Sequence, residues 1–337
     1  MTLKILSSGI TKHLEKLIFI VLSLFALISC NTNNFEDLSV KKPTICYWYN
    51  GAKLAVSFTW DDSNPNHYKI IAPIFDKYNL KASFFPISNT LRTGYYLEGY
   101  KQIAKNGHEI GSHTFSHKDL TTIPLQQVEF ELLKSKQIIN DSLNVNVVSF
   151  VHPYNKYNDS INTLVLMHYG FSRYASVVST DNREIITLMS SFEKLKGLKY
   201  VSNFKNKEKW LILAGHSADG SGYQPVISKE LDSFLAELKN EQDNEVWIGK
   251  FHEVALYDEL RKLTSIGKVT ESTLVIDDSK VDKQRYMNLK VKNLILTIDV
   301  PIYIWEKATG DCVVSKFEHE KSLYLNIDLF KGNKISF

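Results

Sequence analysis

The chain has 337 residues, of which 44% are hydrophobic and 23% charged, and its formal net charge is +3. This length suits one large domain with a smaller one, or two domains, and the composition is that of an ordinary globular protein. So small a net charge argues against a nucleic-acid-binding protein, which needs a concentrated basic face.

The first 29 residues are predicted to be a signal peptide. Three lysines precede an apolar run over residues 17–28, which is too short and too one-sided for a membrane span. The run ends at Ser29-Cys30, before the polar residues 31–34, and resembles a bacterial lipobox. Cys30 is therefore expected to be lipidated, anchoring an exported protein to a bacterial membrane in the cell envelope. The alternative is an ordinary cleaved signal peptide with a chance cysteine.

After a predicted tether over residues 30–50, strand-like apolar runs alternate with helical patterns through a predicted catalytic domain, residues 51–268. Alternation of this kind implies a parallel sheet with helices outside it. About seven such units predict an α/β fold, a distorted, seven-stranded (β/α)-barrel-like domain with its chemistry at the carboxyl ends of the strands. The predicted strands are residues 54–60, 82–87, 109–112, 147–151, 171–178, 210–215 and 246–249.

Residues 269–337 are predicted to form a small all-β appendage, because their apolar runs alternate and no long helical period is visible. Tyr303 and Trp305 are two residues apart and would share one face of a strand. That spacing suits a platform on which a sugar stacks, and equally a stripe that faces a core. The core interpretation is the better supported.

Two adjacent carboxylates, Asp61 and Asp62, follow directly after the apolar run 54–60. Side by side at the end of a buried strand, two negative charges are destabilising unless a positive partner lies close to them. The protein must therefore place a positively charged side chain beside these two carboxylates, or bind a cation there.

His113 and His117 are four residues apart in a predicted strand end and loop. Two neutral imidazoles and one carboxylate are a common ligand set for a catalytic divalent metal, with positions left open for water and substrate. One aspartate would bind the metal, and the other could take a proton from its water. Alternatively the histidines lie on a surface loop and the aspartates cap a helix. His216 follows the run 210–215, and it is either a structural histidine or a general acid.

Four short motifs resemble those of the polysaccharide deacetylases of the NodB-homology superfamily, carbohydrate esterase family 4, over roughly residues 53–260. The family's Thr-Phe-Asp-Asp-Gly corresponds to residues 59–63, and its His-Ser/Thr-x-x-His to residues 113–117. Its Arg-x-Pro-Tyr is matched by residues 151–154, and its late Leu-x-x-His by residues 213–216. Order and spacing agree across all four, which is far more specific than any one motif.

The resemblance implies a role for each residue. Asp62, His113 and His117 would hold a divalent metal, with zinc expected. Asp61 would be the general base, the backbone N–H of Tyr154 would help to stabilise the oxyanion, and His216 would protonate the leaving group. The implied substrate is an acetylated glycan, with N-acetyl groups favoured over O-acetyl groups.

Three departures from the family pattern stand out. Val151 replaces the arginine that orients the base, Ser63 replaces a glycine, and the aspartate that tunes the acid histidine has no clear match. Arg173 and Asp181 are the candidates to replace the missing charges. An amidase acting on a non-carbohydrate substrate, or a catalytically silent glycan-binding lipoprotein, are the alternatives. Retention of both Asp61 and His216 argues against the silent binder.

Overall fold

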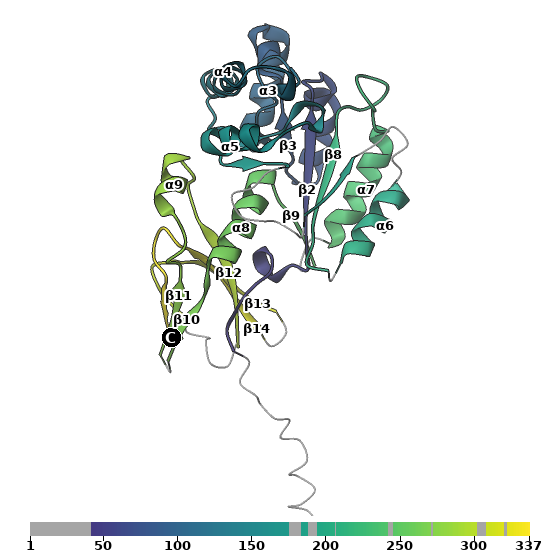
Figure 1. Ribbon diagram of the computed structural model, residues 1–337. Coiled ribbons are helices and arrows are strands. Elements are labelled where there is room, and N and C mark those ends of the chain that lie inside the picture. The colour runs from purple at the N-terminus through teal and green to yellow at the C-terminus, as the bar shows by residue number, and fades with distance from the viewer. Residues whose placement is uncertain are drawn as a thin grey trace, which may run out of the picture. The chain divides into compact units, whose positions relative to one another are not determined.

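The computed structural model describes residues 42–174, 183–187, 194–205, 207–241, 245–270, 272–301, 308–319 and 322–337 (Figure 1). Residues 43–337 form one compact unit. No helix within the described residues is long and apolar enough to cross a membrane. The predictions made for the signal peptide, Cys30, Asp181, Tyr303 and Trp305 lie outside the described residues.

A parallel sheet forms the centre of the larger part of the unit. Five strands lie in the order β4-β3-β2-β8-β7, and a bridge between Ser112 and Phe150 joins β4 to the parallel pair β5-β6. β9 pairs with the first half of β2. The predicted (β/α)-barrel-like fold is confirmed. Its strands are β2 (Leu54–Asp61), β3 (Ser83–Phe85), β4 (Glu109–Ile110), β5 (Ser149–Phe150), β6 (Phe171–Ser172), β7 (Arg183–Thr187), β8 (Trp210–Gly215) and β9 (Val246–Ile248).

Both faces of β2 are buried, which explains why its sequence is mainly apolar up to Asp61. Leu54, Val56, Phe58 and Trp60 pack in the core beneath the helices. The alternate residues face the other way, where small and polar side chains end in Asp61.

The helices are η2 (His67–Ile71), α2 (Ala72–Lys77), α3 (Gly94–Lys105), α4 (Leu125–Leu143), α5 (Asp159–His168), α6 (Lys194–Phe204), α7 (Ser228–Glu241) and α8 (Phe251–Leu263), with the single turns η1 (Tyr49–Gly51), η3 (Ser88–Arg92), η4 (Leu120–Thr122) and η5 (Pro153–Asn155).

The C-terminal part is β-rich, as expected, but it is more closely tied to the barrel than an appendage would be. Its antiparallel sheet has the order β1-β12-β14-β13, and a second sheet has the order β10-β11-β15. A short helix, α9, was not predicted. The elements are β1 (Thr44–Ile45), β10 (Ser265–Val269), β11 (Thr273–Asp277), α9 (Lys283–Asn288), β12 (Ile295–Pro301), β13 (Val313–His319), β14 (Ser322–Asp328) and β15 (Lys334–Ser336).

The predicted tether, residues 30–50, is wrong at its C-terminal end. Thr44 and Ile45 pair with Asp299 and Ile298 of β12, so this segment is an edge strand of the C-terminal sheet. Trp48 is fully buried and its ring lies 6.2 Å from that of Tyr257 in α8. One hydrophobic cluster thus contains residues of the N-terminal segment, the barrel and the C-terminal sheets.

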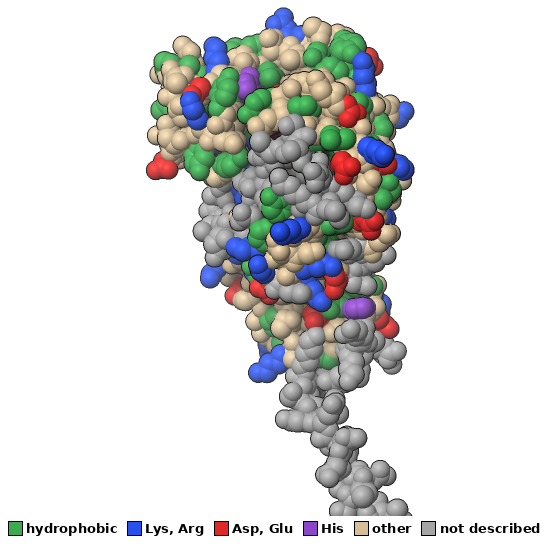
Figure 2. All heavy atoms as spheres, turned by 90° about the vertical axis from the view of Figure 1, so that its right-hand side faces the viewer, with side chains coloured by type: hydrophobic (Ala, Val, Ile, Leu, Met, Phe, Trp, Pro, Cys, Tyr) green, Lys and Arg blue, Asp and Glu red, His purple; other side chains and the backbone are tan. Residues whose placement is uncertain are grey.

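On the face shown in Figure 2, lysines, arginines and carboxylates are interspersed.

Candidate active site

The six predicted site residues lie at or just after the carboxyl ends of barrel strands. Asp61 ends β2 and Asp62 follows it, while His113 and His117 lie in the loop after β4. Tyr154 lies in η5 after β5, and His216 follows β8. Neighbouring parallel strands end at the same edge of the sheet, and this brings together residues up to 155 positions apart in the sequence.

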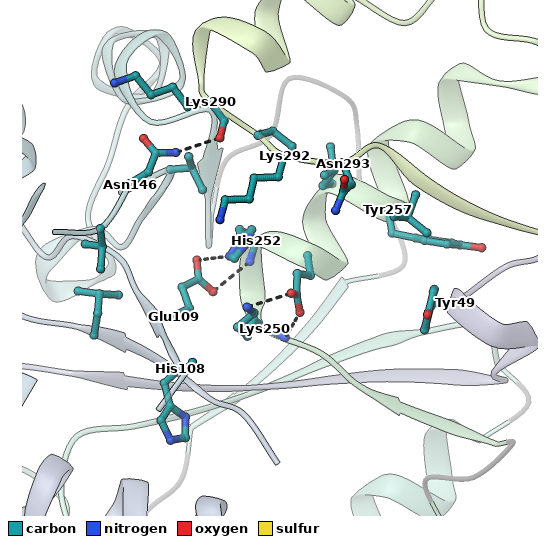
Figure 3. A pocket seen from close by; sticks show the side chains of 18 of the residues that line it. Tyr49, His108, Glu109, Asn146, Lys250, His252, Tyr257, Lys290, Lys292 and Asn293 are labelled. Atoms are coloured by element: carbon teal, nitrogen blue, oxygen red, sulfur yellow. Dashed lines mark hydrogen bonds and ion pairs between the residues drawn. The ribbon is translucent and has the colours of Figure 1, made fainter. Parts of the chain in front are cut away.

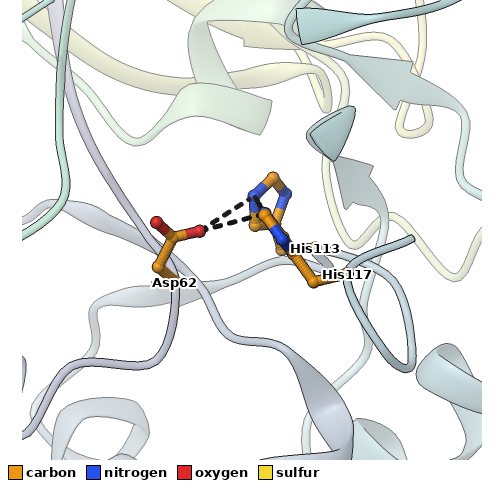
Figure 4. Close-up of side chains that lie close together, drawn as sticks. All are labelled: Asp62, His113 and His117. Atoms are coloured by element: carbon orange, nitrogen blue, oxygen red, sulfur yellow. Dashed lines mark hydrogen bonds and ion pairs between the residues drawn. The ribbon is translucent and has the colours of Figure 1, made fainter. Parts of the chain in front are cut away.

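Asp62, His113 and His117 converge on one point (Figure 4). Asp62 Oδ1 lies 3.3 Å from His113 Nε2 and 3.2 Å from His117 Nε2, and the two Nε2 atoms are 3.1 Å apart. Ligands about 2.0–2.1 Å from a tetrahedral zinc ion are roughly 3.3 Å from one another. The three ligand atoms therefore have the spacing of three corners of such a site.

The tautomer of His113 favours the same interpretation. Its Nδ1–H donates a hydrogen bond of 2.8 Å to the carbonyl oxygen of Val151, which leaves the Nε2 lone pair facing His117 and Asp62. Burial raises the pKa of Asp62, but hydrogen bonds and charge from His113 and His117 outweigh burial and hold the pKa well below its usual value. The carboxylate is thus in its metal-binding form.

Non-glycine residues in the left-handed region gather around this point. Such backbone conformations are costly and cluster at functional sites. Ser63, which stands where the family has glycine, is one of them. Its hydroxyl accepts hydrogen bonds from the Ile87 backbone N–H at 2.7 Å and from Thr90 at 2.9 Å, tying the aspartate turn to the loop after β3. The residues are Asp62 (φ 76°), Ser63 (φ 55°), Thr114 (φ 68°), His117 (φ 59°) and Tyr154 (φ 57°).

The positive partner of Asp61 is Arg173, which follows β6. Its Nη2 and Nη1 donate to the two carboxylate oxygens at 2.7 and 3.2 Å, and Nη1 also donates to Thr59 at 3.0 Å. Both side chains are only 3% exposed, so this is a buried, bidentate ion pair. Arg183 of β7 donates to the carbonyl oxygens of Ser172 and Arg173 at 2.9 and 2.7 Å, which fixes the backbone that carries Arg173.

His216 is held through its backbone by His67 of η2, which sequence reasoning missed. His67 Nε2–H donates to the His216 carbonyl oxygen at 2.8 Å, and His67 Nδ1 accepts from the Tyr100 hydroxyl at 2.7 Å. Burial lowers the pKa of His67 to about 4, so it is neutral. The only signal in the sequence was a histidine within an apolar helical pattern, because a buried histidine needs a polar partner.

Two tyrosine rings flank the site histidines His117 and His216. The Tyr154 ring lies 4.7 Å from the His117 ring and is 61% exposed, and the Tyr223 ring meets His216 edge-on at 4.9 Å. Burial lowers the pKa of His216, although Asp61 and Asp62 act in the opposite direction. Its Nδ1 is buried and has no hydrogen-bond partner among the described residues.

The fold and the site define a class: a barrel-like α/β protein with a carboxylate–imidazole cluster, able to hold a divalent metal, at its strand ends. Residues 49–171 match the sequence model of the polysaccharide deacetylase family. This match, like those to the curated relatives below, covers only part of the chain.

Two curated relatives and one solved structure show the extent of the similarity. "Putative polysaccharide deacetylase YxkH" of Bacillus subtilis is 26% identical over 131 residues, 38% of this chain and 47% of the relative. The "Peptidoglycan deacetylase" of Helicobacter pylori is 32% identical over 108 residues, 32% of this chain and 36% of the relative. This chain thus matches less than half the length of either. A "putative polysaccharide deacetylase" from Mycobacterium smegmatis shares the fold, with a TM-score of 0.54 and 16% identity over 69% of this chain and 99% of that one.

Proposed function

We propose that this protein is a metal-dependent hydrolase that removes acetyl groups, N-acetyl in preference to O-acetyl, from a glycan. The observation that carries the proposal is the convergence of Asp62, His113 and His117 within 4.8 Å of one another, beside Asp61 and His216. The proposal includes export of the chain and lipidation at Cys30, so that the enzyme acts in the cell envelope.

Asp62, His113 and His117 would hold the ion, with zinc expected, and the bound ion would polarise the acetyl carbonyl and lower the pKa of a bound water. Asp61 is the base. Arg173 occupies one direction on each of its oxygens, and each oxygen keeps a second lone pair that can take a proton. The backbone N–H of Tyr154 would donate to the oxyanion, and His216 would protonate the leaving nitrogen.

The experiment is release of acetate by residues 31–337, which include the whole compact unit, from a panel of acetylated glycans. We expect release with zinc and loss after chelation. The panel should include peptidoglycan, chitin-like, exopolysaccharide and xylan substrates. Absence of metal-dependent acetate release from every one of them contradicts the proposal.

Asp61→Asn separates the enzyme from the catalytically silent binder. The amide keeps the shape of the carboxylate but cannot act as a base, so we expect acetate release to fall by at least 100-fold while glycan binding persists. A variant with unchanged acetate release would exclude Asp61 as the base. Release from a simple amide but from none of the glycans would favour the alternative amidase.

A further inference from the structure

A cavity of about 710 Å³ lies away from the strand ends that carry the proposed active site (Figure 3). It is lined by residues 107–110, where β4 begins, and by residues 144–146 and 148, just before β5. The other walls come from the first turn of α8 and from residues 290–293, which lead into β12. The cavity therefore lies between the amino-terminal end of the barrel and the C-terminal sheets.

A buried carboxylate forms part of its wall, and protein groups fill the acceptor positions of that carboxylate. Glu109 Oε2 accepts from Ser83 at 2.6 Å and from the His252 backbone N–H at 3.2 Å, while Oε1 accepts from Ser149 and forms an ion pair with the His252 ring, whose Nδ1 lies 2.9 Å away. A carboxylate offers about four lone-pair directions. Glu109 is therefore satisfied and compensates one positive charge, that of His252.

The charges that remain in the cavity are positive. Burial lowers the pKa of His252, but the charge and hydrogen bond of Glu109 outweigh burial and raise it. Lys250 pairs with Glu253 at 3.0 Å. Lys292 extends into the cavity toward His252 and Glu109, as Figure 3 shows, and it has no carboxylate partner among the described residues. The positive charge of Lys292 is therefore available to pair with an anionic ligand.

One wall of the same cavity is aromatic. The ring of Trp247 lies 5.5 Å from the ring of Tyr49 and 5.5 Å from that of Tyr257. Tyr49 and Trp247 are both partly exposed, and their rings, tilted by 45° to each other, offer apolar surface beside polar groups. Small-molecule sites have this volume and this combination of aromatic wall and few placed polar groups.

We propose that this cavity binds an acidic saccharide unit, a sugar ring that carries a carboxylate or a phosphate. The anionic group would lie between Lys292 and the His252 Nε2–H, and the ring would pack on Tyr49 and Trp247. Such a site, at the opposite end of the strands from Asp62, would hold a charged part of a glycan against the seam between the barrel and the C-terminal sheets.

The test is isothermal titration of residues 31–337 at low salt with four probes. Glucuronic acid and glucose 6-phosphate carry the two candidate anionic groups on a sugar ring, glucose lacks the charge, and inorganic phosphate lacks the ring. We expect at least one acidic sugar to bind ten-fold or more tightly than glucose and than phosphate. The better of the two identifies the anionic group.

Two lysine variants locate the binding. Lys292→Gln should weaken binding of the acidic sugar by ten-fold or more, because the Lys292 side chain points into the cavity. Lys290→Gln is the matched control: it also lines the cavity but points away from His252 in Figure 3, so we expect less than a two-fold change. Both lysines are exposed, so both variants should fold. No binding of either acidic sugar, equal binding of glucose or of phosphate, or undiminished binding by Lys292→Gln would overturn the proposal.

Discussion

At the residue scale, Arg173 shows how the charge problem of the paired aspartates is solved without an arginine at position 151. Val151 is fully buried, and it contributes its carbonyl oxygen to His113. Arg173 follows β6, the strand beside β5, and reaches Asp61 from there. The two aspartates therefore have separate partners: a guanidinium for Asp61, and for Asp62 the imidazoles that could share a metal with it.

Arg173→Lys should lower kcat for acetate release by about 10- to 100-fold with little change in KM. Lysine keeps the charge but cannot form the bidentate pair, and loss of one charge-assisted hydrogen bond is worth about 1.5–3 kcal/mol. The measurement is steady-state kinetics, with thermal unfolding to verify the fold. Arg173→Met is the comparison: it leaves a buried carboxylate unpaired and should cost about 3–5 kcal/mol of stability. Wild-type kcat in the lysine variant would show that the pair only stabilises the fold.

Zinc should raise the melting temperature through Asp62, His113 and His117. An ion at 100 times its dissociation constant stabilises the folded state by about 2.7 kcal/mol. We expect a rise of several degrees in thermal unfolding, reversed by a chelator and absent in Asp62→Asn. His168→Gln is the control, because that histidine pairs with Glu129 outside the cluster and should leave the rise intact. An equal rise in Asp62→Asn would place the ion elsewhere.

At the scale of elements, Glu109 joins four of them. It is bonded to Ser83 of β3, Ser149 of β5 and His252 of α8, and it belongs to β4 itself. Its carboxylate fastens the first turn of α8 across the parallel strands. This explains why α8, which follows the short strand β9, is held against the barrel by polar as well as apolar contacts.

The Glu109–His252 pair predicts how stability depends on pH. Burial raises the pKa of Glu109, but His252 and the two serines outweigh it and lower the pKa from 4.5 to about 2. Its contribution is therefore complete above about pH 4.5 and is lost as the pH falls toward 2. The pKa of His252 is raised above 6.5, so its contribution is complete below 6.5 and is lost as the pH rises through the folded-state value.

Urea unfolding from pH 2 to pH 9 should therefore show this pair contributing most between about pH 4.5 and 6.5. His252→Asn should remove the loss on the alkaline side of that window, because the variant has no imidazolium to lose. His168→Gln should leave the curve nearly unchanged, since its partner Glu129 is 46% exposed and solvent screens that pair. An identical alkaline limb in His252→Asn and the wild type would assign the dependence to another group.

At the scale of the whole molecule, the barrel was predictable and its closure against the C-terminal sheets was not. The buried strand β2 is predictable from its mainly apolar run, and the residues at the ends of β2, β4, β5 and β8 carry the motif chemistry. By contrast, the partner of Thr44 is Asp299, 255 positions away, and two polar residues give no signal of pairing. β7 was not predicted, because it begins with the charged residue Arg183. The contact of Arg173 with Asp61 could not be predicted either, because it depends on which strands are neighbours.

The shared core predicts that the barrel and the C-terminal sheets unfold together. Trp48, Tyr257 and Ile298 belong to one hydrophobic cluster, so deleting residues 265–337 would expose apolar side chains of α8 and the N-terminal segment. We expect one thermal transition for residues 31–337, coincident by tryptophan fluorescence and far-ultraviolet circular dichroism, and an insoluble or molten product from the deletion. Deleting residues 31–42 instead is the control: it removes chain outside the compact unit and should leave the melting temperature unchanged. Two separable transitions, or a soluble 31–264 fragment that melts like the whole, would mean that the C-terminal sheets are an independent domain after all.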